Sequence, residues 1–81
     1  MTKIHNLEIR AEYALPKLKG DKMFEIRKND RNYEVGDIIH YRVIDDEKLN
    51  YEMFTKFYKI KYITDYAQQY GYVVFGEQEW L

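Results

Sequence analysis

Residues 20–37, GDKMFEIRKNDRNYEVGD, constrain the fold more than any other part of the chain. Gly20 suits the positive φ that ends a helix, and Asp21 follows it as a turn former. A wholly polar run occupies residues 28–32, and a tight Val35-Gly36-Asp37 turn precedes an apolar segment. This short stretch therefore predicts the end of a helix, one strand and two turns, and we expect its polar loop to carry function.

The strand predicted within this stretch covers residues 23–27. Its residues alternate as those of a half-buried strand do. Phe24 and Ile26 share one face, which we expect to point into the core, and Glu25 and Arg27 share the other. The residues predicted to be mainly buried are Phe24, Ile26, Ile38, Val43, Ile60 and Val73.

The segments on either side predict one helix and further strands. Residues 3–9 alternate as a first strand that places His5, Leu7 and Ile9 on one face, and residues 11–19 predict a helix shortened or bent by Pro16. A strongly apolar strand begins at residue 37, a long aromatic strand covers residues 51–64, and a last strand covers residues 72–75. Residues 65–70 fit one helical turn or a loop, and Trp80 is expected to cap the core from a tail.

The predicted elements are one helix and about five strands. One helix is too few for a doubly wound sheet, and five strands are too many for a helical bundle. The sequence predicts a small α+β fold, a mostly antiparallel pseudo-barrel with one or two short helices. We expect residues 1–81 to form a single domain, since a chain of this length supports one compact core.

The residue types present exclude several kinds of site. The chain has no cysteine, and its two histidines, His5 and His40, are isolated, so we expect no metal and no cofactor. His5 on an apolar face fits a hydrogen-bonded core histidine better than a ligand. The polar N-terminus lacks the apolar core of a signal peptide, and no apolar run is long enough to span a membrane, so we expect a soluble, cytoplasmic protein.

Charge is distributed unevenly along a chain whose net charge is −1. Residues 17–31 hold six basic side chains and three acidic ones, whereas residues 32–52 hold two basic and six acidic ones. Residues 53–64 add three lysines and no acidic residue. These segments predict either a local basic face suited to phosphate or a mixed, solvated surface.

The central motif resembles the ASCH domains of the PUA-like superfamily, including small phage and bacterial proteins. The spacing G-x-K-x-x-E-x-R, which continues into Asn29-Asp30-Arg31 and Val35-Gly36-Asp37, carries the resemblance. His5 and Leu7 in the first strand and the Gly71–Val74 segment extend it along nearly the whole chain. The resemblance implies a PUA-like pseudo-barrel with a cleft beside the helix and a role in binding RNA or nucleotides.

The residues predicted to form a nucleic-acid site are Lys22, Glu25, Arg27, Lys28, Asn29, Asp30 and Arg31. An arginine fork suits phosphate, while the Asn29 and Asp30 side chains suit a base edge. The alternative is a structural ion pair between Glu25 and Arg27 and a loop that only shapes a turn. Tyrosines considered as stacking surfaces for unpaired bases are Tyr33, Tyr41, Tyr70 and Tyr72.

Two other functions stay open at this point. Some ASCH relatives resemble amidohydrolases that deacetylate a modified cytidine, and Lys22 occupies the position of their reactive lysine. Glu25 stands where those relatives have a threonine, and an adjacent carboxylate favours a charged, unreactive lysine. If the protein is a hydrolase of a modified nucleoside, Lys22 and Glu25 are its candidate catalytic residues. The third possibility is a phage adaptor that acts through protein contacts.

Overall fold

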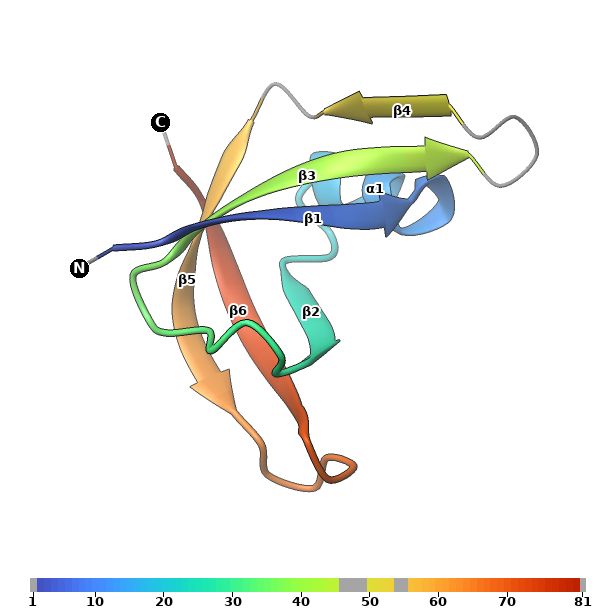
Figure 1. Ribbon diagram of the computed structural model, residues 1–81. Coiled ribbons are helices and arrows are strands. Elements are labelled where there is room, and N and C mark those ends of the chain that lie inside the picture. The colour runs from blue at the N-terminus through green and yellow to red at the C-terminus, as the bar shows by residue number, and fades with distance from the viewer. Residues whose placement is uncertain (1, 46–49, 54–55, 81) are drawn as a thin grey trace.

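The computed structural model describes residues 2–45, 50–53 and 56–80. Within these residues the chain forms one α-helix and six β-strands, arranged as in Figure 1. Their bounds are β1 (Ile4–Arg10), α1 (Ala11–Leu18), β2 (Phe24–Lys28), β3 (Ile38–Asp45), β4 (Asn50–Met53), β5 (Phe57–Thr64) and β6 (Tyr72–Trp80).

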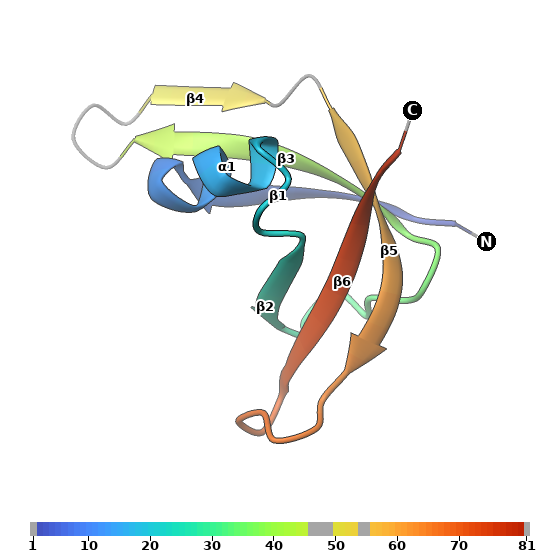
Figure 2. The same cartoon turned by 180° about the vertical axis from the view of Figure 1, so that it is seen from behind.

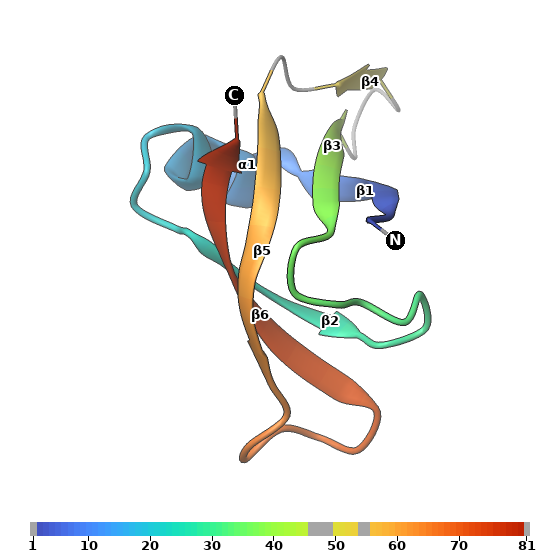
Figure 3. The same cartoon turned by 90° about the vertical axis from the view of Figure 1, so that its left-hand side faces the viewer.

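The strands form one sheet in the order β1-β3-β5-β6-β2, with β4 paired to β3 off this path. β1 and β3 run parallel, and the other pairs are antiparallel. The sheet is curled: Figure 1 shows β1 and β3 running at a steep angle to β5 and β6, and Figure 3 shows β3 beside β5. The predicted small, mostly antiparallel α+β pseudo-barrel is confirmed, and it takes the form of a half-barrel.

The strand predicted over residues 51–64 is two strands, β4 and β5. β5 carries a bulge between Ile60 and Tyr62, where one extra residue lies opposite β6. Phe54, a residue of the predicted 51–64 strand, lies outside the described residues. The described loop at residues 65–71 contains no helical turn, so the loop alternative holds there.

The helix is short, as Pro16 predicted. α1 has eight residues with Pro16 inside it, and its chain turns at Gly20, whose φ is 86°. Its buried residues are Ala14 and Lys17. The helix therefore presents a lysine, and not only apolar side chains, to the inside of the fold.

The core lies on the concave side of the sheet. Its buried apolar residues are Leu7, Ile9, Ala14, Tyr33, Ile38, Ile39, Tyr41, Tyr58, Ile60, Val73 and Phe75. The predictions for Ile38, Ile60 and Val73 are confirmed, and Val43 is partly buried against the core. Tyr33 and Tyr41 are core residues, so neither offers a free stacking surface.

The predicted orientation of β2 is wrong. Phe24 and Ile26 are 45% and 55% exposed, whereas Glu25 is only 5% exposed. Glu25 and Arg27 do share a face, but it is the inward one. The reason is that the buried Lys17 ammonium lies inside the half-barrel at this point, so the carboxylate is stabilised there and the two apolar side chains lie outside.

The first strand faces the core as predicted, whereas the end of the last strand does not. Leu7, Ile9 and His5 face inward from β1, which confirms the first strand and the core position of His5. Trp80 belongs to β6 and is about half exposed, so it does not cap the core. No helix in the part of the chain described here is long and apolar enough to cross a membrane.

Candidate functional site

A cluster of charged side chains is buried where α1, β2 and β6 meet. Lys17 Nζ lies 2.5 Å from Glu77 Oε1 and 3.0 Å from Glu25 Oε2. Tyr41 donates its hydroxyl proton to Glu77 Oε2 at 2.7 Å. The same ammonium lies 5.1 Å from the Tyr41 ring centroid, within cation–π range. Each charge in this cluster therefore has a partner, as burial requires.

Lys22 and Arg27 hold the outer side of Glu25. Lys22 Nζ donates to Glu25 Oε2 at 2.7 Å, and Arg27 Nε donates to Glu25 Oε1 at 3.3 Å. Arg27 Nη2 also donates to the backbone oxygen of Glu8 at 2.8 Å. One guanidinium thus joins the buried cluster on β2 to the edge of β1, across the open side of the half-barrel.

The two buried glutamates differ in their acidity. Burial by itself raises the pKa of Glu25, but the Lys17 charge and the hydrogen bond from Lys22 outweigh it and hold the pKa below its ordinary value. Burial raises the pKa of Glu77 above its ordinary value in spite of Lys17 and Tyr41. Glu25 is therefore a stable carboxylate and a weak base.

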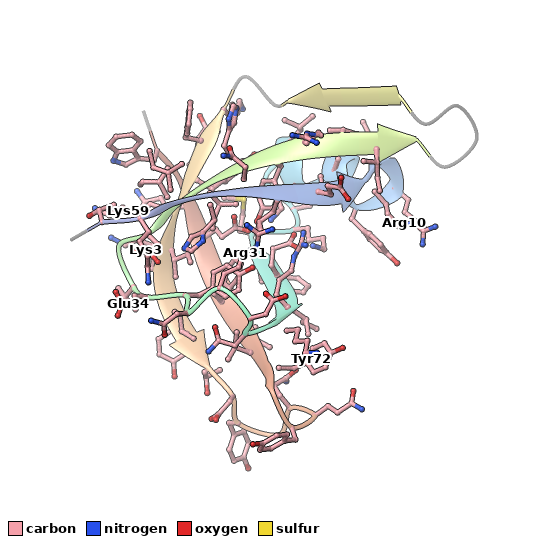
Figure 4. All side chains as sticks on the ribbon, viewed as in Figure 1. Lys3, Arg10, Arg31, Glu34, Lys59 and Tyr72 are labelled. Carbon is pink, nitrogen blue, oxygen red and sulfur yellow. The ribbon has the colours of Figure 1, made fainter. Side chains whose placement is uncertain are left out.

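A polar pocket of about 450 Å³ lies beside this cluster, and Arg31, labelled in Figure 4, is one of its lining residues. Four basic side chains and two acidic ones line it, so positive charge is in excess. The complete lining is Asn6, Leu7, Glu8, Arg27, Lys28, Asp30, Arg31, Tyr33 and Arg42. We call this hollow the basic pocket.

The loop at residues 29–37 forms one wall of the basic pocket and is held from two sides. Asn29 Oδ1 accepts from the amide of Tyr33 at 3.1 Å. Asp37 is buried, lies 2.9 Å from His5 Nε2, and accepts from the amides of Lys3 and Glu34. Figure 4 shows Lys3 and Glu34 at this loop. These bonds fix the backbone from which Asp30 and Arg31 project.

The predicted site residues divide between two places. Arg27, Lys28, Asp30 and Arg31 line the basic pocket. Lys22 and Glu25 line a smaller hollow of about 350 Å³ with Tyr13, Phe24 and Ile26. Asn29 lines neither of these hollows and shapes the loop. Arg27 contacts both Glu25 and Glu8, so the two hollows are joined through one side chain.

Sequence reasoning missed five residues of this region, namely Asn6, Glu8, Lys17, Arg42 and Glu77. A signal existed for two of them. Lys17 shares the helical face of Ala14, and Glu77 continues the inward alternation of Val73 and Phe75. Asn6, Glu8 and Arg42 reach the pocket only through the pairing and curl of β1 and β3, which no local pattern reveals.

The described residues contain no group of three or more histidine, cysteine, aspartate or glutamate side chains placed to hold a metal ion. Guanidinium, ammonium and amide groups line the basic pocket as hydrogen-bond donors, and two carboxylates line it as acceptors. Such a set suits an anion with hydrogen-bonding edges.

Comparison with known proteins gives a family and a phage relative. Residues 4–76 match the family described as "Domain of unknown function (DUF3850)". A protein of Escherichia phage P2, described as "Uncharacterized 12.9 kDa protein in GpA 3'region", is 49% identical over 39 residues. That alignment covers 48% of this chain and 36% of the phage protein. The matched part therefore spans about a third of the length of this curated relative.

Proposed function

Because the chain belongs to the DUF3850 family, whose description assigns no activity, we propose from the site itself that it is an RNA- or nucleotide-binding module. The observation that carries this proposal is the basic pocket. Arg27, Lys28, Arg31 and Arg42 converge there from β2, β3 and the loop between them. Clustered arginines suit phosphate because a guanidinium donates two parallel hydrogen bonds to it.

The remaining groups in the basic pocket suit a nucleoside. Asp30 and Glu8 carry acceptors for amino or hydroxyl donors, and the Asn6 amide offers both donors and acceptors. A hollow of about 450 Å³ is within the usual range of small-ligand sites. Positive charge therefore favours the phosphate, and the mixed donors and acceptors favour a sugar or base edge.

The resemblance to ASCH domains supports the same proposal. The fold is a small barrel-like α+β domain, and the motif residues Glu25 and Arg27 lie on β2, with Lys22 just before it and bonded to Glu25. We propose that the chain is an ASCH-like member of the PUA-like superfamily and that its basic pocket binds the nucleic acid. No cofactor is needed for such binding.

Titration tests the proposal most directly. We would measure binding of nucleoside monophosphates and of a short single-stranded RNA at two salt concentrations. Arg31→Ala is expected to weaken binding and to reduce the salt slope by about one, because one phosphate contact is lost. Lys19→Ala is the control, because it also removes one positive charge, but from an exposed lysine that does not line the basic pocket.

Two results would contradict the proposal. Equal losses in the Arg31 and Lys19 variants would show that only overall charge matters. Absence of binding to every nucleotide and RNA tested would favour the third class, an adaptor that acts through protein contacts.

A further inference from the structure

The outward face of β2, β6 and β5 carries exposed aromatic side chains. Figure 2 shows these three strands side by side. Phe24 is paired with Gly76, and Gly76 is paired with Tyr62, so the three residues form one row across the strands. Tyr62 is 65% exposed and Phe24 is 45% exposed. We call these three residues the Gly76 row.

Gly76 leaves the middle of this row without a side chain. Its φ is not among the positive values, so the backbone does not require glycine there. A Cβ atom at this position would meet only Tyr62 Cβ, at an ordinary contact distance of 4.0 Å. Glycine inside a strand often marks a bulge or a close approach by a ligand. The bulge on the neighbouring β5 ends at Tyr62, opposite Gly76, but the room for a Cβ atom at Gly76 means that packing within the protein does not require a bare position there.

Two strand spacings separate the rings at the ends of the row. Adjacent strands lie about 4.8 Å apart, so the backbones of Phe24 and Tyr62 are about 9.6 Å apart. A planar ring stacks on an aromatic face, and stacking on both sides requires a gap between two rings. The Gly76 row offers such a gap, with a bare backbone as its floor.

The Gly76 row is continuous with the basic pocket along β2. Lys28 lines the basic pocket, and it lies on the same outward face as Ile26 and Phe24. Tyr72 is the cross-strand partner of Lys28, and the Asn29 amide donates to the backbone oxygen of Gly71 at 2.8 Å. From Lys28 to Phe24 the strand rises about 13 Å, at about 3.3 Å per residue.

Positive charge accompanies this path. Lys22 Nζ lies 5.0 Å from the Phe24 ring centroid, at one end of the row. Lys28 on β2 and Lys61 on β5 are exposed. Cations and exposed aromatic rings are the two components of a surface that binds single-stranded nucleic acid. The cations attract the phosphate backbone, and the rings stack on the bases.

We propose that the Gly76 row is a second base-binding site, which stacks one base of a single strand that continues from the basic pocket past Lys28 and Tyr72. This inference rests on the proposed function of the basic pocket. It identifies the ligand as a single-stranded oligonucleotide of several residues, and not a free mononucleotide. Five stacked nucleotides are separated by four steps of about 3.4 Å, so they reach about 14 Å and span the roughly 13 Å between Lys28 and Phe24.

The test compares uridine 5′-monophosphate with a single-stranded uridine pentanucleotide in fluorescence or calorimetric titrations. Gly76→Val fills the gap with a side chain and does not force the backbone into a forbidden angle. Tyr62→Ala, which removes an exposed ring of the row, provides a second test in case Gly76→Val does not fold. We expect the pentanucleotide to bind at least ten-fold more tightly than the mononucleotide. Each variant should lower pentanucleotide affinity about five-fold or more, which is the lower range for one stacked base.

The mononucleotide affinity of both variants should equal that of the wild type. Tyr66→Ala is the control, because this tyrosine is 83% exposed in the loop between β5 and β6 and is not part of the row. A folded Gly76→Val protein that binds the pentanucleotide as the wild type does would overturn the second site. Equal wild-type affinities for the two ligands would overturn it too, while leaving the basic pocket in place. Failure of the wild type to bind either ligand would overturn the pocket and the second site together.

Discussion

Lys17 and Glu77, sixty positions apart in the chain, form an ion pair in which both side chains are fully buried. The pair joins the only helix among the described residues to the last strand. Glu25, on β2, binds the same ammonium. Three segments that are distant in the sequence are thus held around one cation, directly behind the residues that face the basic pocket.

Loss of the Lys17 ammonium should be strongly destabilising. Lys17→Met keeps the length of the side chain but leaves Glu25 and Glu77 buried beside each other without that cation. Removing one partner of a buried ion pair costs about 3–5 kcal/mol. Urea denaturation at pH 7 would measure the loss against Lys19→Met, which changes an exposed lysine and should alter stability little. Similar stabilities for the two variants would contradict the central role of Lys17.

The orientation of β2 predicts unequal effects for two phenylalanines. Phe75→Ala empties a fully buried position and should cost about 3–5 kcal/mol. Phe24→Ala removes a half-exposed ring and should cost well under half as much. Chemical denaturation of the two proteins provides the comparison. A larger loss for Phe24→Ala would mean that β2 has the opposite face turned inward.

Stability should depend on pH through Asp37. Burial alone raises the pKa of this carboxyl, but hydrogen bonds from His5 and from the amides of Lys3 and Glu34 hold it below the ordinary 3.8. A carboxyl with a lowered pKa in the folded state stabilises the protein above the unfolded-state pKa, and this contribution is lost as the pH falls through the folded-state pKa.

Asp37→Asn should therefore be less stable than the wild type at pH 7, and the difference should shrink below about pH 3.8. Denaturant titrations at a series of pH values would show this. Asp21→Asn, in an exposed turn, serves as the control. A stability difference that does not change with pH would mean that the Asp37 side chain stabilises the fold through its shape and not through its charge.

The protein should not deacetylate acetylcytidine. Lys22 Nζ donates hydrogen bonds to Glu25 Oε2 and to the Phe24 backbone oxygen, so it is held in a structural network. The pKa of Glu25 is lowered, so this carboxylate is a poor general base. Incubation of the purified protein with acetylcytidine, followed by chromatography, is the assay. Turnover that disappears in Lys22→Ala would make the protein an enzyme and would contradict the binding role.

Local sequence patterns predicted much of this fold. The alternation in residues 3–9 placed His5, Leu7 and Ile9 correctly, and Gly20 marked the turn after a short helix. These predictions succeeded because periodicity and backbone preferences depend on near neighbours alone. The loop after β2 was also predicted from its polar and turn-forming residues, and several of these residues line or shape the basic pocket.

The tertiary structure alone decided which face of β2 is buried. Alternation shows that Phe24 and Glu25 point to opposite sides, but it does not show which side is the core. That choice depends on Lys17 and Glu77, which approach Glu25 only after the sheet has curled. In the same way, Glu8 and Arg42 join the basic pocket through the pairing of β1 with β3. A buried charge needs a partner from elsewhere in the chain, and such partners are set by the packing of distant segments and not by local sequence.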